Sequence, residues 1–144
     1  MIDALSNTSP KSFDVILVLG VFYHTMHQFK MLQELSRIQP KYVVLDTLTT
    51  GEEEWLIRYK LERHDLPGSS IATSENRPRS MVGIPSIGWI DIVCRHPGFA
   101  YAEVDWQKLS INSWDGCGDY KNGKRRTYLL WLDKRHGVRS HPFI

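Results

Sequence analysis

The feature that most constrains this chain is a nearly continuous apolar run at residues 13–22, FDVILVLGVF, which ends in Tyr23 and His24. A run of this kind is typical of a strand that is buried on both faces, as in a parallel sheet. A buried helix has a similar composition, but the β-branched residues and Gly20 favour a strand. The apolar stretch is also far shorter than the ~20 residues that a membrane-spanning helix needs.

The residues that follow this run complete a strand–helix–strand unit. Residues 26–38 carry apolar side chains at helical spacing, and Pro40 is expected to end that helix. Residues 42–47, YVVLDT, form a second short apolar strand. Two strands joined by a helix are expected to be parallel, with a right-handed crossover.

The middle of the chain, residues 48–83, is long and mixed. The acidic stretch at residues 52–62 predicts a helix with Trp55 and Tyr59 on one face, and residues 64–80 predict a loop. A connection of this length is often functional, for example as a lid over a site. An insertion without a role is the alternative.

The last third of the chain predicts one more helix and two strands. Residues 86–96 suit a helix capped by Ser86, with Cys94 in the core and not a reactive thiol. Strands are expected at residues 101–106 and 125–132. Asn122-Gly123 between them is a strong hairpin signal, so these two strands are expected to be antiparallel.

Size and composition predict one globular domain. The chain has 144 residues, of which 42% are hydrophobic and 24% charged. It has two cysteines and no basic region followed by an apolar one at its N-terminus, so a reducing cytoplasm is expected. Lys and Arg outnumber Asp and Glu by 7 to 1 in residues 121–144. This basic end is either a solvated surface or a patch for phosphate, carboxylate or nucleic acid.

Candidate site residues lie where the first strand ends. Ligands of open α/β sheets bind at the carboxyl ends of the strands, and Gly20 lets another group approach the backbone closely there. Tyr23 and His24 offer rings and hydrogen bonds at the same place. The alternative is that these two residues only cap the strand.

These segments together resemble a known family. FDVILVLGVFYH, an amphipathic helix and YVVLDT are similar to the fourth strand, the following helix and the fifth strand of class I S-adenosylmethionine-dependent methyltransferases. The ending LGVFYH is most similar to the subgroup of tRNA wobble-uridine carboxymethyltransferases. The resemblance covers about residues 13–135 and is specific over residues 13–47. It implies an α/β, Rossmann-like methyltransferase fold, present as its C-terminal half and with a C-terminal antiparallel hairpin.

The resemblance also implies a cofactor and the residues that bind it. S-adenosylmethionine, or a carboxylated derivative, would contact Leu19 and Tyr23 on either side of Gly20. Arg126, next to Arg125, would help to bind a carboxylated cofactor. His24 is the nearest candidate for a general base, and the acceptor would be a small molecule, a sugar-like compound or a tRNA.

One departure from the family matters more than these matches. The family binds its cofactor mainly through a glycine-rich loop after its first strand, whereas Gly116-Cys117-Gly118 here follows no buried strand and predicts a turn. About 90 residues of preceding βαβ structure are expected to be absent. The chain therefore predicts a half-domain, with a non-catalytic fragment or a partner subunit of a split methyltransferase as the alternative. Its first strand would be an exposed edge that pairs with the missing half or with a second copy.

Two further signals are weak. His24 and His27 lie three residues apart, but no third ligand stands in pattern, so no metal site is predicted. Trp106, Trp114, Tyr120 and the basic residues at 121–126 mix rings with positive charge, which suits RNA. For these aromatic and basic residues, a packed hairpin with exposed basic side chains is the favoured interpretation.

Overall fold

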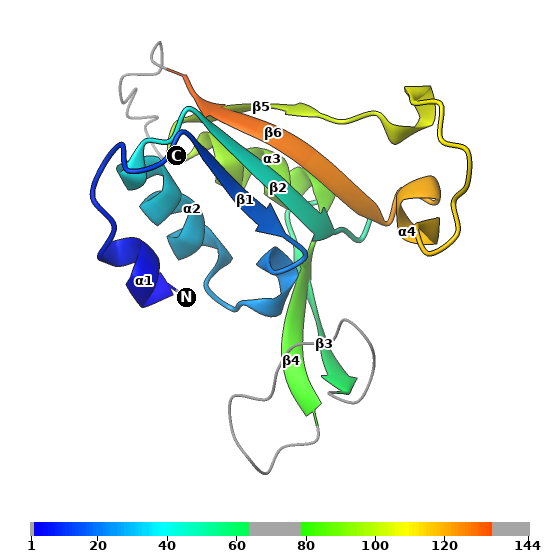
Figure 1. The fold of residues 1–144 in the computed structure, drawn as a ribbon. Coiled ribbons are helices and arrows are strands. Elements are labelled where there is room, and N and C mark those ends of the chain that lie inside the picture. Colours follow the sequence, from blue (N-terminus) through cyan, green and yellow to red (C-terminus); the bar gives the residue numbers. More distant parts are fainter. Residues whose placement is uncertain (1, 64–78, 134–144) are drawn as a thin grey trace.

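The computed structural model describes residues 2–63 and 79–133. Its centre is a four-stranded mixed sheet in the order β1-β2-β6-β5 (Figure 1). The strands are β1 (Val15–Leu19), β2 (Tyr42–Leu48), β6 (Arg125–Leu132) and β5 (Phe99–Glu103). β1 and β2 are parallel, and β6 runs antiparallel to both β2 and β5. The predicted parallel pair and the predicted antiparallel pair are both confirmed.

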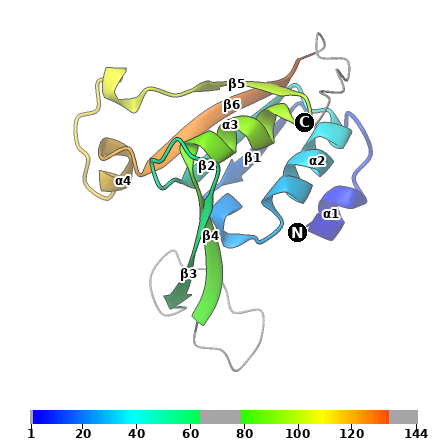
Figure 2. The same ribbon diagram turned by 180° about the vertical axis from the view of Figure 1, so that it is seen from behind.

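Two helices cover one face of this sheet, as both Figure 1 and Figure 2 show. α2 (Gln28–Ile38) joins β1 to β2, and α3 (Ile87–Arg95) leads into β5. A short helix, α1 (Ile2–Ser6), lies against α2. In the described ranges, no helix has the length and apolar character that crossing a bilayer requires.

The core lies between these helices and alternate residues of the strands. Neighbouring residues of a strand point to opposite faces, so every second side chain of the sheet faces the helices. The fully buried members include Met31, Leu32, Leu35, Val43, Leu45, Ile90, Cys94, Tyr128 and Leu130. Burial, more than the nearby Asp91, raises the pKa of the Cys94 thiol to about 12. The prediction that Cys94 is a core residue is confirmed.

The opposite face of the sheet carries exposed apolar side chains along its edge. Val15, Leu17 and Leu19 of β1 are 50%, 61% and 54% exposed, and Tyr42, opposite Val15 on β2, is 46% exposed. β1 is an edge strand, with β2 as its one partner in the described sheet. No described helix covers this side of β1 (Figures 1 and 2). The apolar surface formed by Val15, Leu17, Leu19 and Tyr42 is called the open face below.

The predicted helix at residues 52–62 is wrong. The chain instead runs irregularly to Leu56 and then forms β3 (Ile57–Arg63), which pairs antiparallel with β4 (Arg79–Pro85). These strands form a separate two-stranded arm that projects from the sheet (Figure 1). Most of the loop predicted at residues 64–80 lies outside the described residues.

Tertiary contacts explain why the acidic stretch forms no helix. The carbonyl of Glu52 accepts hydrogen bonds from the backbone N–H groups of Ile87 and Gly88, at 3.0 and 3.3 Å. The backbone of Leu56 exchanges a further pair of bonds with Ser86, at 2.9 and 3.2 Å. These carbonyls and amides therefore hold the start of α3 and are not available for helical bonds. Ser86 also caps α3, as predicted, by accepting from the Trp89 amide at 3.0 Å.

The connection between β5 and β6 is longer than the predicted hairpin. It contains a 3-10 turn, η2 (Trp106–Lys108), and a one-turn helix, α4 (Gly118–Lys121). Asn122-Gly123 ends α4, because the Asn122 amide donates to the carbonyl of Gly118 at 3.0 Å and Gly123 has φ +67°. The turn signal is therefore real, but it closes a helix and does not join two strands directly.

Gly88 is expected to be intolerant of a methyl group. A Cβ there would lie 1.8 Å from the carbonyl oxygen of Glu53, a backbone atom. Gly88→Ala should lower the free energy of unfolding by about 1–3 kcal/mol, although alanine favours a helix by about 1 kcal/mol elsewhere. Urea denaturation followed by circular dichroism measures this change.

The matched control is Gly118→Ala, also at a helical position. A Cβ at Gly118 would meet no atom within 4 Å, so this variant should be at least as stable as the parent. Equal midpoints for the two variants would contradict the packing of residues 52–54 against α3.

Candidate functional site

The carboxyl ends of β1 and β2 lie side by side, as the strand–helix–strand pattern predicts. Leu19 is opposite Asp46, and the Gly20 amide donates to the Asp46 carbonyl at 3.0 Å. Gly20 has φ +68°, where other residues are strained, while a Cβ there would make only ordinary contact with Arg125 at 3.6 Å. Glycine is thus favoured here by the backbone turn more than by lack of space.

A buried carboxylate joins this edge to β6. The Asp46 residue is 4% exposed. One of its oxygens accepts from Nη1 of Arg125 at 2.7 Å, and the other accepts from the Thr127 hydroxyl at 2.8 Å. The Thr127 hydroxyl oxygen in turn accepts from the Trp106 indole N–H at 3.3 Å. The charge of Asp46 is therefore compensated by an arginine and by the neutral hydroxyl of Thr127, as a buried charge requires.

Arg125 also reaches the predicted cofactor residue Tyr23. Its Nη2 donates to the Tyr23 hydroxyl at 3.4 Å, and its guanidinium carbon lies 5.6 Å from the Tyr23 ring centre and 5.8 Å from that of Tyr120. Burial alone would lower the pKa of Arg125, but its bonds to Asp46 and Tyr23 outweigh burial and raise it. Burial and, next, a bond to Asp46 raise the pKa of Tyr120. Arg125 is therefore a fixed positive charge between two aromatic rings.

Arg126 lies elsewhere. Its Nη1 contacts both carboxylate oxygens of Glu103, at 2.7 and 3.0 Å. Because successive residues of a strand point to opposite faces, Arg126 is directed to the helix-covered side of the sheet and Arg125 to the other. The structure thus does not bring Arg126 together with Leu19, Gly20 and Tyr23. The adjacent Arg125 holds that position.

His24 is placed at the mouth of the sheet by a 3-10 turn, η1 (Phe22–His24), that follows Gly20. Its ring lies 4.0 Å from the Tyr23 ring, and its Nδ1 is 3.4 Å from a carboxylate oxygen of Glu62 on β3. Tyr23 is 5% exposed, whereas Leu19 presents more than half of its surface. Leu19, the last residue of β1, and Gly20 lead directly into the turn that carries Tyr23 and His24, and the exposed apolar side chains of this segment are Leu19 and Val21.

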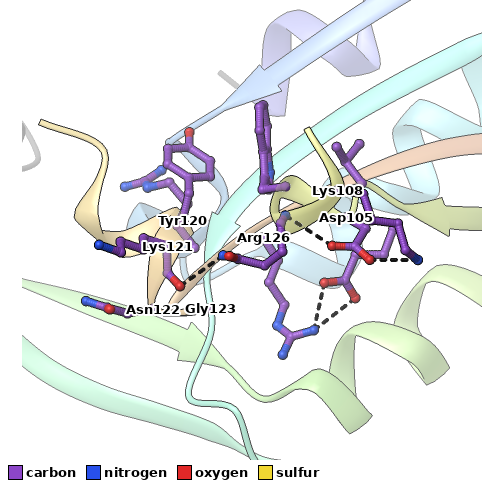
Figure 3. Close-up of a pocket in the computed structure, with 12 residues that line it drawn as sticks. Asp105, Lys108, Tyr120, Lys121, Asn122, Gly123 and Arg126 are labelled. Atoms are coloured by element: carbon purple, nitrogen blue, oxygen red, sulfur yellow. Dashed lines mark hydrogen bonds and ion pairs between the residues drawn. The ribbon is translucent and has the colours of Figure 1, made fainter. Parts of the chain in front are cut away.

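Arg125 also lines a pocket. It is an open pocket of about 630 Å³ between η2 and α4, at the start of β6 (Figure 3). Both arginines, Trp106 and Tyr120 line it, together with Lys108 and Lys121. The mixture of rings and basic groups noted in the sequence thus lines a real concavity, although Trp114 is not among its lining residues.

Sequence reasoning missed Asp46 and Thr127. The one signal for Asp46 was an acidic residue near the end of an apolar strand, where a buried charge is costly without a partner. Nothing in the sequence pairs it with residues about 80 positions away.

Metal and glycine-loop sites are not seen in the part of the chain that the structure describes. No three His, Cys, Asp or Glu side chains gather there in a group that could hold a metal ion. Gly116 and Gly118 lie just before and at the start of α4, a helix of four residues, and follow no strand directly.

Comparison with known proteins gives a match of fold. No family model matches the chain, and no curated protein matches it. Among solved structures it is similar to the N-terminal domain of EvdMO1, crystallised in the presence of SAH and D-fucose. The TM-score is 0.59 at 12% sequence identity, over 92% of this chain and 52% of that one.

The likeness is one of fold. It supports the predicted partial Rossmann-like α/β fold, of the kind seen in a domain solved with SAH. The chain spans about half the length of that neighbour. Membership of the tRNA-modifying subgroup stays a prediction.

Asp46→Asn tests the buried pair. The neutral amide would leave Arg125, whose side chain is 18% exposed, without its charge partner. We expect a loss of about 2–4 kcal/mol in the free energy of unfolding, measured by urea denaturation.

The control for this test is Asp14→Asn. It breaks the ion pair between Asp14 and Lys41, whose side chains are 75% and 73% exposed, and it should cost less than about 1 kcal/mol. Similar losses in both variants would show that Asp46 is no more important than a surface charge.

Proposed function

We propose that this chain forms one wall of an S-adenosylmethionine site in a methyltransferase-like domain. The observation that supports this most is the turn after β1, where exposed Leu19, Gly20 with positive φ and Tyr23 stand together at the carboxyl end of a parallel strand. Ligands of open α/β sheets bind at this edge. The fold likeness to a domain crystallised with SAH, the product of methyl transfer, points to the same cofactor.

The residues of the turn suit such a cofactor. Leu19 would supply an apolar contact, and Gly20 would leave the backbone accessible. Tyr23 is held in place by Arg125 and would give the wall a rigid aromatic side. When bound, S-adenosylmethionine supplies an electrophilic methyl group on a sulfonium, so the protein's main task is to position the acceptor.

His24 would serve as the general base if the acceptor carries a proton. Its imidazole stands beside Tyr23, and Glu62 lies 3.4 Å from Nδ1. A carboxylate at that nitrogen favours the imidazolium that forms when the other nitrogen takes a proton. In this role Glu62, carried by the β3–β4 arm, would help to orient the imidazole.

Unmodified S-adenosylmethionine suits the site better than a carboxylated derivative. Both arginines near the site already pair with a carboxylate, Arg125 with Asp46 and Arg126 with Glu103, so neither is available for an added carboxylate. Freeing Arg125 would leave the buried Asp46 charge without its partner, which is costly. The acceptor we propose is a small molecule or a tRNA nucleotide.

The rest of the cofactor site would come from a further α/β segment. The open face and the free edge of β1 are apolar, and parallel strands are normally covered on both faces. The fold neighbour has about as much chain again beyond the matched part. That segment is either joined to this chain or belongs to a separate subunit. If it belongs to a separate subunit, this chain is a non-catalytic partner of that subunit. A further alternative is that two copies of this chain pair through the edge of β1.

SAH should bind the 144-residue chain weakly and at one place. We expect no heat of binding at micromolar concentrations in calorimetry, because the chain supplies one wall. At about millimolar SAH, NMR should show shifts of the Leu19, Gly20 and Tyr23 amides.

Leu19→Asp should abolish these shifts, whereas Val15→Asp, at the far end of the same exposed strand face, should not. Micromolar binding would contradict the proposal of a single wall. If the same shifts are seen in Leu19→Asp, the location of the site is contradicted.

A further inference from the structure

The pocket between η2 and α4 has the size of a small-molecule site. Its volume of about 630 Å³ lies in the range of small-molecule sites, about 300–1,000 Å³. Figure 3 shows Tyr120, Lys121 and Asn122 on one side and Asp105 and Lys108 on the other, with Arg126 between them. Two segments twelve or more residues apart therefore face each other across it.

The two sides are tied together without a ligand. The Gln107 side chain donates to the carbonyl of Lys121 at 3.1 Å, across the gap between η2 and α4. The rings of Trp106 and Tyr120 meet edge to face, with centroids 5.0 Å apart and planes at 62°. The Trp106 indole is also anchored to Thr127 of β6. The aromatic part of the pocket is thus pre-organised, which lowers the cost of binding.

Of the basic side chains that line the pocket, all but one have a carboxylate partner among the described residues. Arg126 is neutralised by Glu103, and Lys108 by Asp105 at 2.9 Å. Arg125 is neutralised by Asp46 from outside the pocket. Lys121 is the remaining lining cation, and no described carboxylate lies within ion-pair distance of it. A ligand with one anionic group would find a partner there, and a ligand with two separate anionic groups would not find two.

We propose that this pocket binds a planar ring that carries one anionic group, with the ring against Trp106 and Tyr120 and the anion at Lys121. Aromatic carboxylic acids and nucleoside monophosphates share this chemistry. The pocket meets the cofactor wall at Arg125, whose guanidinium carbon lies 5.6 Å from the centre of the Tyr23 ring and 5.8 Å from that of the Tyr120 ring. Resting on the proposed function, this ligand is the methyl acceptor.

Binding is tested without a methyl donor, so its outcome is independent of the cofactor site. The probes are 4-hydroxybenzoate, uridine 5′-monophosphate and uridine, titrated into the full chain by NMR. We expect the indole N–H signal of Trp106 to shift with one or both anions and hardly at all with neutral uridine. A response to the nucleotide and not to the benzoate would identify a nucleotide as the acceptor class, and the reverse an aromatic acid.

Variants separate the ring from the charge. Lys121→Gln should weaken anion binding about three- to tenfold, whereas Lys124→Gln, a neighbouring exposed lysine outside the pocket lining, should leave it unchanged. Trp106→Phe, which keeps a ring but loses the bond to Thr127, should weaken the binding of every probe that binds, measured through the backbone amides of Lys121 and Asn122 because the indole signal is absent in this variant.

Three results would overturn the proposal. The first is that no probe shifts the Trp106 signal at about 10 mM, because a dissociation constant above this concentration is too weak for a specific site. The second is that Lys121→Gln and Lys124→Gln change the affinity equally. The third is that uridine binds as tightly as its monophosphate. Loss of SAH binding with intact anion binding would instead count against the proposed function alone.

Discussion

The buried Asp46 carboxylate is the interaction on which the functional edge of this protein depends. It lies at the end of β2, and its two oxygens take hydrogen bonds from Arg125 and Thr127 of β6. This fixes the antiparallel neighbour at the point where the parallel strands end. Arg125 then holds Tyr23, and Thr127 holds Trp106. One charge that must be satisfied in the interior thus aligns the turn after β1, the start of β6 and the η2 segment.

The same network connects two places that the chain builds separately. The turn after β1 belongs to the parallel half of the sheet, and the pocket between η2 and α4 belongs to the antiparallel half. Arg125 lies between them, within 6 Å of the centres of both the Tyr23 and the Tyr120 rings. A substitution of Arg125 would therefore alter both the turn after β1 and the pocket.

In the described part of the chain, helices cover one face of the sheet. α2 and α3 cover one face, and the open face keeps Leu17 61% exposed (Figures 1 and 2). An apolar parallel edge of this kind is a surface for another layer of chain. The fold neighbour, of which this chain matches 52%, is long enough to include such a layer. The predicted edge strand is thus seen in the structure, while its occupant is the subject of the proposal above.

The sequence by itself determined the βαβ unit, α3 with its Ser86 cap, and the antiparallel order of β5 and β6. Local patterns carry these features, because burial on both faces, helical spacing and capping chemistry act over a few residues. Only the tertiary structure decided the rest. Residues 57–63 became a strand because β4 pairs with them and the preceding backbone bonds to α3. Arg125, and not Arg126, reached Tyr23 because the register of β6 against β2 assigns each arginine its face, and register is a long-range property that no local pattern contains.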